Sequence, residues 1–232
     1  MRKLWILLAA TLIVSVAWAQ NNKSNNGNES NVHARLNKSA NILENMTNTA
    51  PDKGIPQSVI DNAKCVAVIP HMIKGAFIVG GEHGSGFATC RTSSGWSAPA
   101  PFSVTGISWG PQIGGQSTNL IMMVMNNEGM KDLISGHFKV GGDVSAAAGP
   151  VGRQASASAG WKAGILTYSQ SKGAFVGASI SGAEIQQDNS ATKELYGRDV
   201  SFKSILKGST KAPTVASRFE RAVANANQRA AK

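Results

Sequence analysis

The sequence has few aromatic residues, few acids and only two cysteines. Aromatic side chains make up 6% of the 232 residues, so the core must consist mainly of Val, Ile, Leu, Met and Ala. It contains 13 acidic residues against 23 lysine and arginine residues, a formal net charge of +10 at pH 7. It also lacks a recognised nucleic-acid-binding motif and a visible catalytic set. We therefore expect no nucleic-acid partner, no cofactor and no metal site.

The N-terminal segment has the pattern of a targeting sequence. Two basic residues begin the chain, an apolar run follows over 4–16, and residues 17–19 form an A-x-A cleavage site. The run is short for a membrane span, so 1–19 is predicted to be a signal peptide, with a retained interfacial anchor as the alternative. The Asn- and Ser-rich segment 20–31 is predicted to be a disordered linker. The mature chain is expected to be exported, either periplasmic or secreted, with possible peripheral attachment to a membrane.

The middle of the chain predicts an α+β fold. Between Cys65 and Ile180, short β-prone runs alternate with glycine clusters, which is typical of a mostly antiparallel sheet. Glycine within strands permits strong coiling, so the sheet is expected to be strongly curved, barrel-like or sandwich-like. Helical periodicity and capping residues predict flanking helices at both ends. The helices are expected from Val32 to Pro51 and over 56–63, 127–135, 188–197 and 209–232.

The two cysteines predict a disulfide. In an exported protein, a pair such as Cys65 and Cys90 is expected to be oxidised, and this bridge would contribute about 3 kcal/mol to stability. The alternative is a zinc site that also uses His71 and His83, which lie between the cysteines. Their spacing matches no compact set of zinc ligands.

Two glycine-rich motifs have catalytic or nucleotide-binding alternatives. Gly106–Gly110 matches G-x-S-x-G, the motif that surrounds a serine nucleophile, but no helix is predicted after Ser108. Gly80–Gly86 resembles a phosphate-binding loop but lacks its Gly-Lys-Ser/Thr ending and a following helix. We interpret the first motif as part of a strand and the second as a hairpin turn. The chain is not expected to be an enzyme, and a serine esterase that uses Ser108 is the third functional alternative.

A series of short motifs follows one another over residues 32–207: Cys65–Pro70, Lys74–Phe77, Gly84–Gly86, Gly95–Pro99, Gly114–Thr118, Ala147–Arg153, Lys172–Phe175 and Leu195–Gly197. Their order resembles the SYLF domain, a lipid-binding family also described as an actin-binding domain in fungal members. The resemblance implies binding of phosphoinositides and other anionic phospholipids. Actin is an unlikely partner for an exported chain. The functional alternative is a structural or scaffold protein of the cell envelope without a lipid ligand.

The C-terminal end carries most of the positive charge. Residues 198–232 contain eight lysine and arginine residues and two acidic residues, a net charge of +6. Segment 208–232 is predicted to be a basic, helical tail that contacts an anionic membrane surface. Shallow apolar insertion of Phe219 and Val223 is expected to be only a minor contribution, because this helix face is rich in Ala. The alternative is a tail that only aids solubility. The residues predicted to bind lipid are Lys203, Lys207, Lys211, Arg218 and Arg221.

Overall fold

A computed structural model describes residues 26–152, 163–171, 174–180 and 182–228, with side chains for all of them except 26–30, 75–79, 107–116 and 171. The helices are α1 Asn26–Asn48, α2 Gln57–Asn62, α3 Asn127–Ser135, α5 Asn189–Tyr196, α6 Phe202–Leu206, the 3-10 helix η1 Thr214–Ala216 and α7 Ser217–Gln228. The strands are β1 Cys65–Thr92, β2 Gly95–Trp96, β3 Ala100–Val124, β4 His137–Lys139, β5 Ala146–Ala148, β6 Ile165–Ser171, β7 Ala174–Gly177 and β8 Glu184–Gln187.

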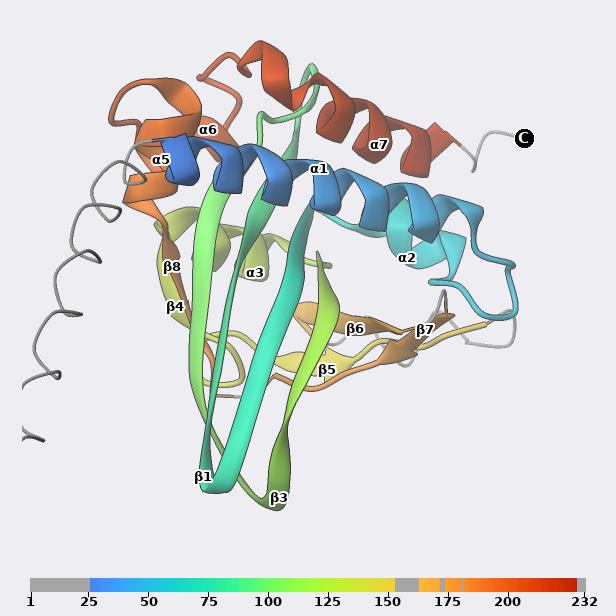
Figure 1. The fold of residues 1–232 in the computed structure, drawn as a ribbon. Coiled ribbons are helices and arrows are strands. Elements are labelled where there is room, and N and C mark those ends of the chain that lie inside the picture. The colour runs from blue at the N-terminus through green and yellow to red at the C-terminus, as the bar shows by residue number, and fades with distance from the viewer. Residues whose placement is uncertain (1–25, 153–162, 172–173, 181, 229–232) are drawn as a thin grey trace, which may run out of the picture.

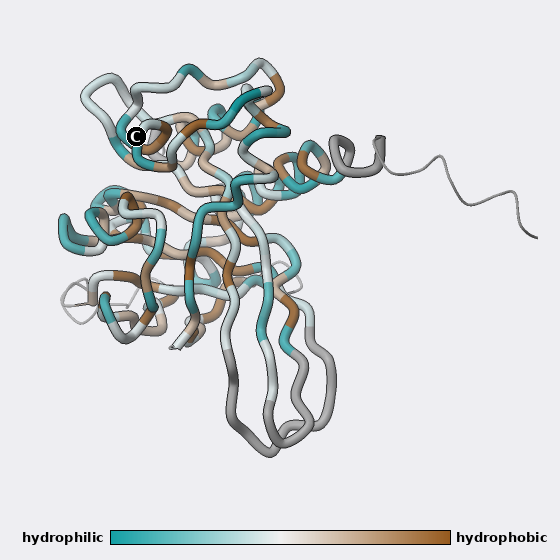
Figure 2. The backbone as a smooth tube through the Cα atoms, turned by 90° about the vertical axis from the view of Figure 1, so that its left-hand side faces the viewer, coloured by the Kyte–Doolittle hydropathy of each residue, from teal (hydrophilic) through white to brown (hydrophobic). Residues whose placement is uncertain are grey.

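The two longest strands form one antiparallel ribbon that folds back on itself. β1 pairs with β3 from Cys65 opposite Val124 to Ala88 opposite Ala100. Both strands turn back near the middle of their length, so each contributes two limbs to the sheet (Figure 1). The two ends of β1 therefore meet, and the Cα atoms of Cys65 and Cys90 are 4.0 Å apart. The ribbon extends away from the layer of helices (Figure 2).

The glycine cluster Gly80–Gly86 lies inside β1, so the predicted hairpin turn there is wrong. These residues pair continuously with β3. A Cβ atom on Gly86 would lie 2.0 Å from the carbonyl oxygen of Val68, and one on Gly84 would lie 2.6 Å from Ile69 Cγ2. The glycines therefore allow the two limbs of the folded strand to approach closely, and do not reverse the chain at this point.

The remaining strands extend the ribbon into a curved sheet. One limb of β3 pairs with β6 and the other pairs with β8, both antiparallel, while β5 and β6 form a parallel pair. The result is a strongly curled half-barrel with helices at both ends of the chain, which confirms the predicted α+β class. The sequence did not predict β8 or α6 as separate elements.

Helices cover both faces of the sheet. One core cluster lies between the sheet and helices α1, α2, α5 and α7, and a second lies on the other face, where α3 and α6 pack. Apolar and polar residues alternate along the helices, as Figure 2 shows by colour. The buried stripe of α1 is the predicted one: Val32, Leu36, Ala40, Leu43 and Met46.

The C-terminal helix is part of this core. α7 runs along α1 (Figure 1), and Phe219 and Val223 are 1% and 2% exposed. The ring of Phe219 lies 6.2 Å from that of Phe87 in β1. The prediction that Phe219 and Val223 insert into a membrane is therefore wrong, because their side chains are already buried within the domain.

The predicted signal peptide, 1–19, lies outside the described residues, as does the first half of the predicted linker. Helix α1 begins at Asn26, so the rest of that linker is helical. In the described part of the chain, no helix is long and apolar enough to cross a bilayer.

Candidate functional site

A cleft of about 440 Å³ opens between α1, α5 and an irregular point in β1. Seven polar side chains dominate its lining: Asn31, Arg35, Lys38, His71, Asp188, Ser190 and Glu194. Arg35 and Lys38 lie three residues apart on α1, and this spacing places both on one helix face. Ser190 and Glu194 lie four residues apart on α5 in the same way. Two helices, α1 and α5, therefore line the cleft with polar side chains.

His71 owes its position to a break in strand pairing. The β1–β3 register shifts between Ile69 and Met72, and His71 between them has φ 60°, the left-handed conformation. Non-glycine residues seldom adopt this conformation, and it costs of order 1 kcal/mol or more. The His71 backbone N–H donates a hydrogen bond to Asn119 Oδ1 at 3.3 Å, and Nδ1 lies 3.4 Å from Ser117 Oγ. These contacts hold the exposed imidazole at the edge of the cleft.

The N-terminus of α5 points towards the same space. Asp188 caps the helix, because its Oδ1 accepts a hydrogen bond from the Ala191 backbone N–H at 2.9 Å. Its other carboxylate oxygen lies 3.8 Å from Arg35 Nη2. The helix dipole adds partial positive charge at this end. One carboxylate thus organises both α5 and the side of α1 that faces it.

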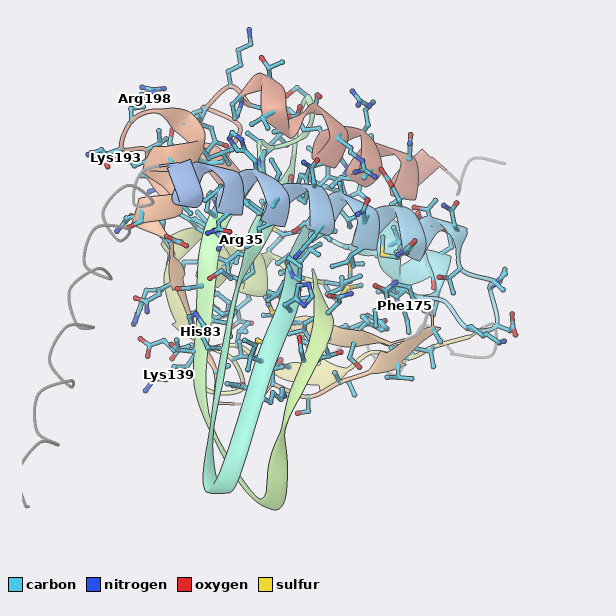
Figure 3. The ribbon with its side chains drawn as sticks, in the orientation of Figure 1. Arg35, His83, Lys139, Phe175, Lys193 and Arg198 are labelled. Carbon is cyan, nitrogen blue, oxygen red and sulfur yellow. A yellow bond between two sulfur atoms is a disulfide. The ribbon has the colours of Figure 1, made fainter. Side chains whose placement is uncertain are left out.

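Arg35 is held against the sheet. Its guanidinium carbon lies 5.7 Å from the centre of the Phe87 ring, and its Nε is buried without a hydrogen-bond partner among the described residues. Figure 3 shows Arg35 between α1 and the sheet. Lys38, by contrast, is exposed and forms no ion pair within the described part of the chain. The ionised side chains of the lining are Arg35 and Lys38 against Asp188 and Glu194, so their formal charges cancel.

Of the residues predicted to bind lipid, four are on the surface. Lys203 in α6, Lys207 and Lys211 after it, and Arg221 in α7 are exposed, and none forms an ion pair with a described acidic residue. We call these four residues the basic corner; three of them lie in or just after α6, and the fourth lies in α7. Lys193 and Arg198, which sequence reasoning missed, lie on the outside of the adjacent α5 region (Figure 3), where Lys193 Nζ is 3.6 Å from Asp199.

Arg218 differs from the other four. It binds Glu44 of α1 through two hydrogen bonds, from Nε at 3.1 Å and from Nη2 at 2.8 Å, and it also contacts Asn41. The hydrogen bond to Glu44 raises the pKa of Arg218 above its ordinary value. Its guanidinium therefore joins α7 to α1, a role that the charge pattern of the sequence did not reveal.

The predicted disulfide between Cys65 and Cys90 is present. The alternative zinc site is wrong, because both sulfur atoms are already bonded to each other. In the described residues, no group of His, Cys, Asp and Glu side chains could hold a metal ion. The disulfide links the two ends of β1 and so stabilises the folded ribbon.

The backbone at Ser108 does not form a nucleophile elbow. Ser108 lies inside β3 opposite Gly80 of β1, and β3 continues to Val124. A nucleophile elbow requires a strand, a sharp turn and then a helix. The G-x-S-x-G match is therefore a stretch of strand, as we interpreted it from the sequence.

A family model described as "Las17-binding protein actin regulator", Ysc84, matches residues 105–226, more than half of the chain. The chain belongs to this family, the SYLF family. The resemblance noted in the sequence is thereby confirmed. The match includes the basic corner and most of α7, so it extends beyond the 32–207 range that the motifs suggested.

Curated relatives support the SYLF assignment. Protein YSC84 of Saccharomyces cerevisiae is 35% identical over 171 residues, which cover 71% of this chain and 36% of the relative. SH3 domain-containing YSC84-like protein 1 of Homo sapiens is 31% identical over 200 residues, which cover 83% of this chain and 58% of the relative. The SYLF chain thus spans about a third to somewhat over half of these relatives. No solved structure matches it.

The relatives correct one expectation. The family description names an actin regulator, and another yeast relative, 36% identical over 168 residues, is named LAS seventeen-binding protein 3. The expectation that actin is an unlikely partner is therefore wrong. It depended on export, which was inferred from residues 1–19 alone, whereas the family is described by its part in actin regulation. One of these three relatives is named for binding, and none of the three names states a catalysed reaction.

Proposed function

We propose that this SYLF protein binds membrane surfaces through anionic phospholipid headgroups, phosphoinositides among them, and that it does so as an exported protein. The observation that carries the proposal is the basic corner. Lys203, Lys207, Lys211 and Arg221 are exposed and have no acidic partner among the described residues. A basic residue near an anionic bilayer contributes about 1 kcal/mol, so four together supply about 4 kcal/mol.

The short helix α6 gives the corner a rigid base. Ser201 caps it by accepting a hydrogen bond from the Ser204 backbone N–H at 3.2 Å. Phe202, Ile205 and Leu206 are buried in the second core cluster. Lys203 therefore faces solvent from a fixed helix, which reduces the conformational entropy lost when a headgroup binds.

The test is vesicle flotation with a variant in which all four residues of the basic corner are replaced by Gln. Arg218 stays unchanged, because its loss would break the contact between α7 and α1. A matched control carries the same loss of charge at four exposed lysines elsewhere: Lys53, Lys64, Lys131 and Lys139. Circular dichroism establishes that both variants are folded before binding is compared.

We expect the corner variant to lose most of its binding to anionic vesicles and the control variant to keep it. If both variants lose binding equally, net charge matters but the corner is not the site. If neither loses binding, the positive charge of the corner only aids solubility. No flotation of the wild-type chain would favour the alternative of a structural or scaffold protein without a lipid ligand.

A second candidate is binding of a protein that takes part in actin regulation. The family description favours it, as does the name of the yeast relative LAS seventeen-binding protein 3. Co-sedimentation with purified actin filaments at physiological salt tests direct binding to actin. Co-sedimentation of the folded chain without flotation would favour this candidate over the lipid proposal.

A further inference from the structure

We propose that the bend of the β1–β3 ribbon inserts into the apolar layer of a membrane, at the end of the molecule opposite the basic corner. We call residues 75–81 of β1 and the paired residues 107–115 of β3 the ribbon tip. The two ends of the molecule would then contact separate bilayers, so that one chain joins two membrane surfaces. Insertion of the tip goes beyond the proposed function, whereas the joining of two membranes also rests on it.

The ribbon tip lies far from the basic corner. The bends of β1 and β3 lie at one end of the molecule, beyond β5, β6 and β7, whereas α6 and α7 lie at the other end (Figure 1). A flat bilayer that contacts the basic corner is therefore separated from the tip by the body of the domain. The tip is a surface distinct from the one that carries the proposed function.

The sequence of the ribbon tip is apolar and uncharged. Its 16 residues include no Asp, Glu, Lys, Arg or His, although Asp, Glu, Lys and Arg make up 16% of the chain. Half of the 16 are apolar, among them Phe77, Ile78, Val79, Ile107, Trp109 and Ile113. Ile73, just before the tip, is 56% exposed, so apolar surface faces water at its base. Such a segment enters an apolar layer without the cost of transferring a charge.

Strand pairing continues through the tip. β1 and β3 stay paired on both sides of one register shift, between Ala76 and Ile78, opposite which β3 has the residues 111–113. Pro111 in that segment has no N–H group that could be left unpaired. Unpaired backbone N–H and C=O groups are costly in an apolar layer, so a paired ribbon can enter where an irregular loop could not.

An ion pair holds the base of the tip. Lys74 Nζ lies 3.0 Å from Glu82 Oε2, and the Glu82 side chain is 5% exposed. These two residues flank 75–81, one on each limb of β1, so their contact joins the limbs where the tip begins. Their charges cancel at this boundary. Because the limbs are already held together, less conformational entropy is lost when the tip enters a membrane.

The size of the tip favours a lipid layer over a second copy of the chain. A stable contact between two proteins takes about 20–30 residues on each side. The ribbon tip has 16 residues, of which eight are apolar. A fluid layer of acyl chains needs no matching protein surface, and tryptophan, present here as Trp109, is enriched at membrane interfaces. The occupant is therefore the apolar layer of a membrane, entered from its interface.

The assay presents many tips on one surface. A single small tip holds a chain only weakly on a neutral vesicle, but many tips that bind together gain avidity. The full chain is attached to beads through a tag after Lys232, which follows α7 in the helix layer away from the tip. The beads are then mixed with fluorescent phosphatidylcholine vesicles at physiological salt. We expect the beads to capture these vesicles.

Three variants show whether the tip is responsible. Phe77→Ser with Trp109→Ser should lower capture at least about tenfold, since burial of one aromatic side chain is worth about this factor. Val151→Ser with Val176→Ser removes two apolar side chains elsewhere, 39% and 51% exposed, and should leave capture unchanged. The variant without the basic corner should also capture neutral vesicles, so failure of the proposed function and failure of the tip are distinguishable. Circular dichroism and urea unfolding establish that each variant is folded.

A fluorophore at the tip reports insertion directly. A polarity-sensitive dye attached at Gln112→Cys should gain emission on capture and should be quenched by brominated phosphatidylcholine in the vesicles. The same dye attached at Lys131→Cys, on α3, should show neither effect. The native cysteines are bonded to each other and do not react with the dye.

Three results would overturn insertion of the tip. They are no capture by densely coated wild-type beads, equal capture by the Phe77→Ser, Trp109→Ser variant, and a wild-type dimer in sedimentation that this variant lacks. The last result would assign the tip to a second copy of the chain. The joining of two membranes predicts that the untagged wild-type chain clusters anionic with neutral vesicles at low salt, and that loss of either the basic corner or the tip abolishes clustering. Flotation and capture without clustering would overturn this joining.

Discussion

Removal of the disulfide should lower stability without changing the fold. Cys65 and Cys90 are separated by 25 residues in the sequence, and both side chains are 0% exposed. In the chain-entropy model, closing a loop of this length stabilises the native state by about 3 kcal/mol. The ends of β1 also meet through hydrogen bonds from the Arg91 backbone N–H to Lys64 O and from Arg91 Nε to Ala63 O, each at 2.8 Å. These bonds should keep the ribbon folded after the sulfur link is lost.

The assay is equilibrium unfolding of the wild-type chain and of the variant Cys65→Ala, Cys90→Ala, each with and without reductant. A loss of about 3 kcal/mol should lower the urea midpoint by at least about 1 M and the melting temperature by about 6–12 °C. Reductant should lower the wild-type midpoint to that of the variant and leave the variant unchanged. Equal midpoints for the wild-type chain and the variant without reductant, with two thiols alkylated in freshly purified wild-type chain, would refute the reasoning.

Three other changes test separate parts of the account. In urea unfolding, Gly86→Ala should destabilise the protein by more than about 3 kcal/mol, because the new methyl group would lie 2.0 Å from Val68 O. Gly81→Ala is the control: its methyl group would lie 4.0 Å from Gly106 O, and it should cost less than about 1 kcal/mol. Burial raises the pKa of Glu220, so the ionised form destabilises the native state. Glu220→Gln should therefore raise the urea midpoint at pH 7. This gain should shrink as the pH falls from the raised pKa of the folded state to the ordinary pKa of Glu, and it should vanish at pH values below that ordinary pKa. A fluorophosphonate probe should not label Ser108, since β3 provides no nucleophile elbow; labelling that Ser108→Ala abolishes would contradict this expectation.

Local sequence signals predicted the helices well. α3 occupies the predicted 127–135, and α5 begins after the Asp188 cap and ends before Gly197, whose left-handed conformation matches its predicted role. The spacing of apolar residues predicted the buried stripe of α1. These features depend on residues that are close in the sequence, so one sequence was sufficient to find them.

Local sequence signals could not predict that the β1–β3 ribbon folds back on itself. Glycine permits both a turn and a close approach of two strands, and the sequence around Gly84 and Gly86 is compatible with either. The choice depends on Val68 and Ile69, which lie well before them in the chain. The burial of Phe219 has the same origin, because it depends on the contact between α7 and α1.

The sequence predicted the residues of the basic corner, but it did not predict the cleft. Charge alone identified the exposed residues of the basic corner, but it also selected Arg218, because composition does not show that Glu44 lies opposite. The cleft brings together α1, β1 and α5, which are far apart in the sequence. Its local signals were the spacings of Arg35 and Lys38 and of Ser190 and Glu194, and such spacings are common on exposed helices.

The central claim is that this SYLF protein binds anionic membrane surfaces electrostatically. The most direct test is flotation of the full chain with anionic vesicles and with neutral phosphatidylcholine vesicles, at low and at physiological ionic strength. We predict strong recovery with anionic vesicles at low salt, weaker recovery as the Debye length falls from roughly 30 Å to 8 Å, and little recovery with neutral vesicles. Equal recovery with both kinds of vesicle, or recovery with anionic vesicles that salt does not change, would contradict the claim.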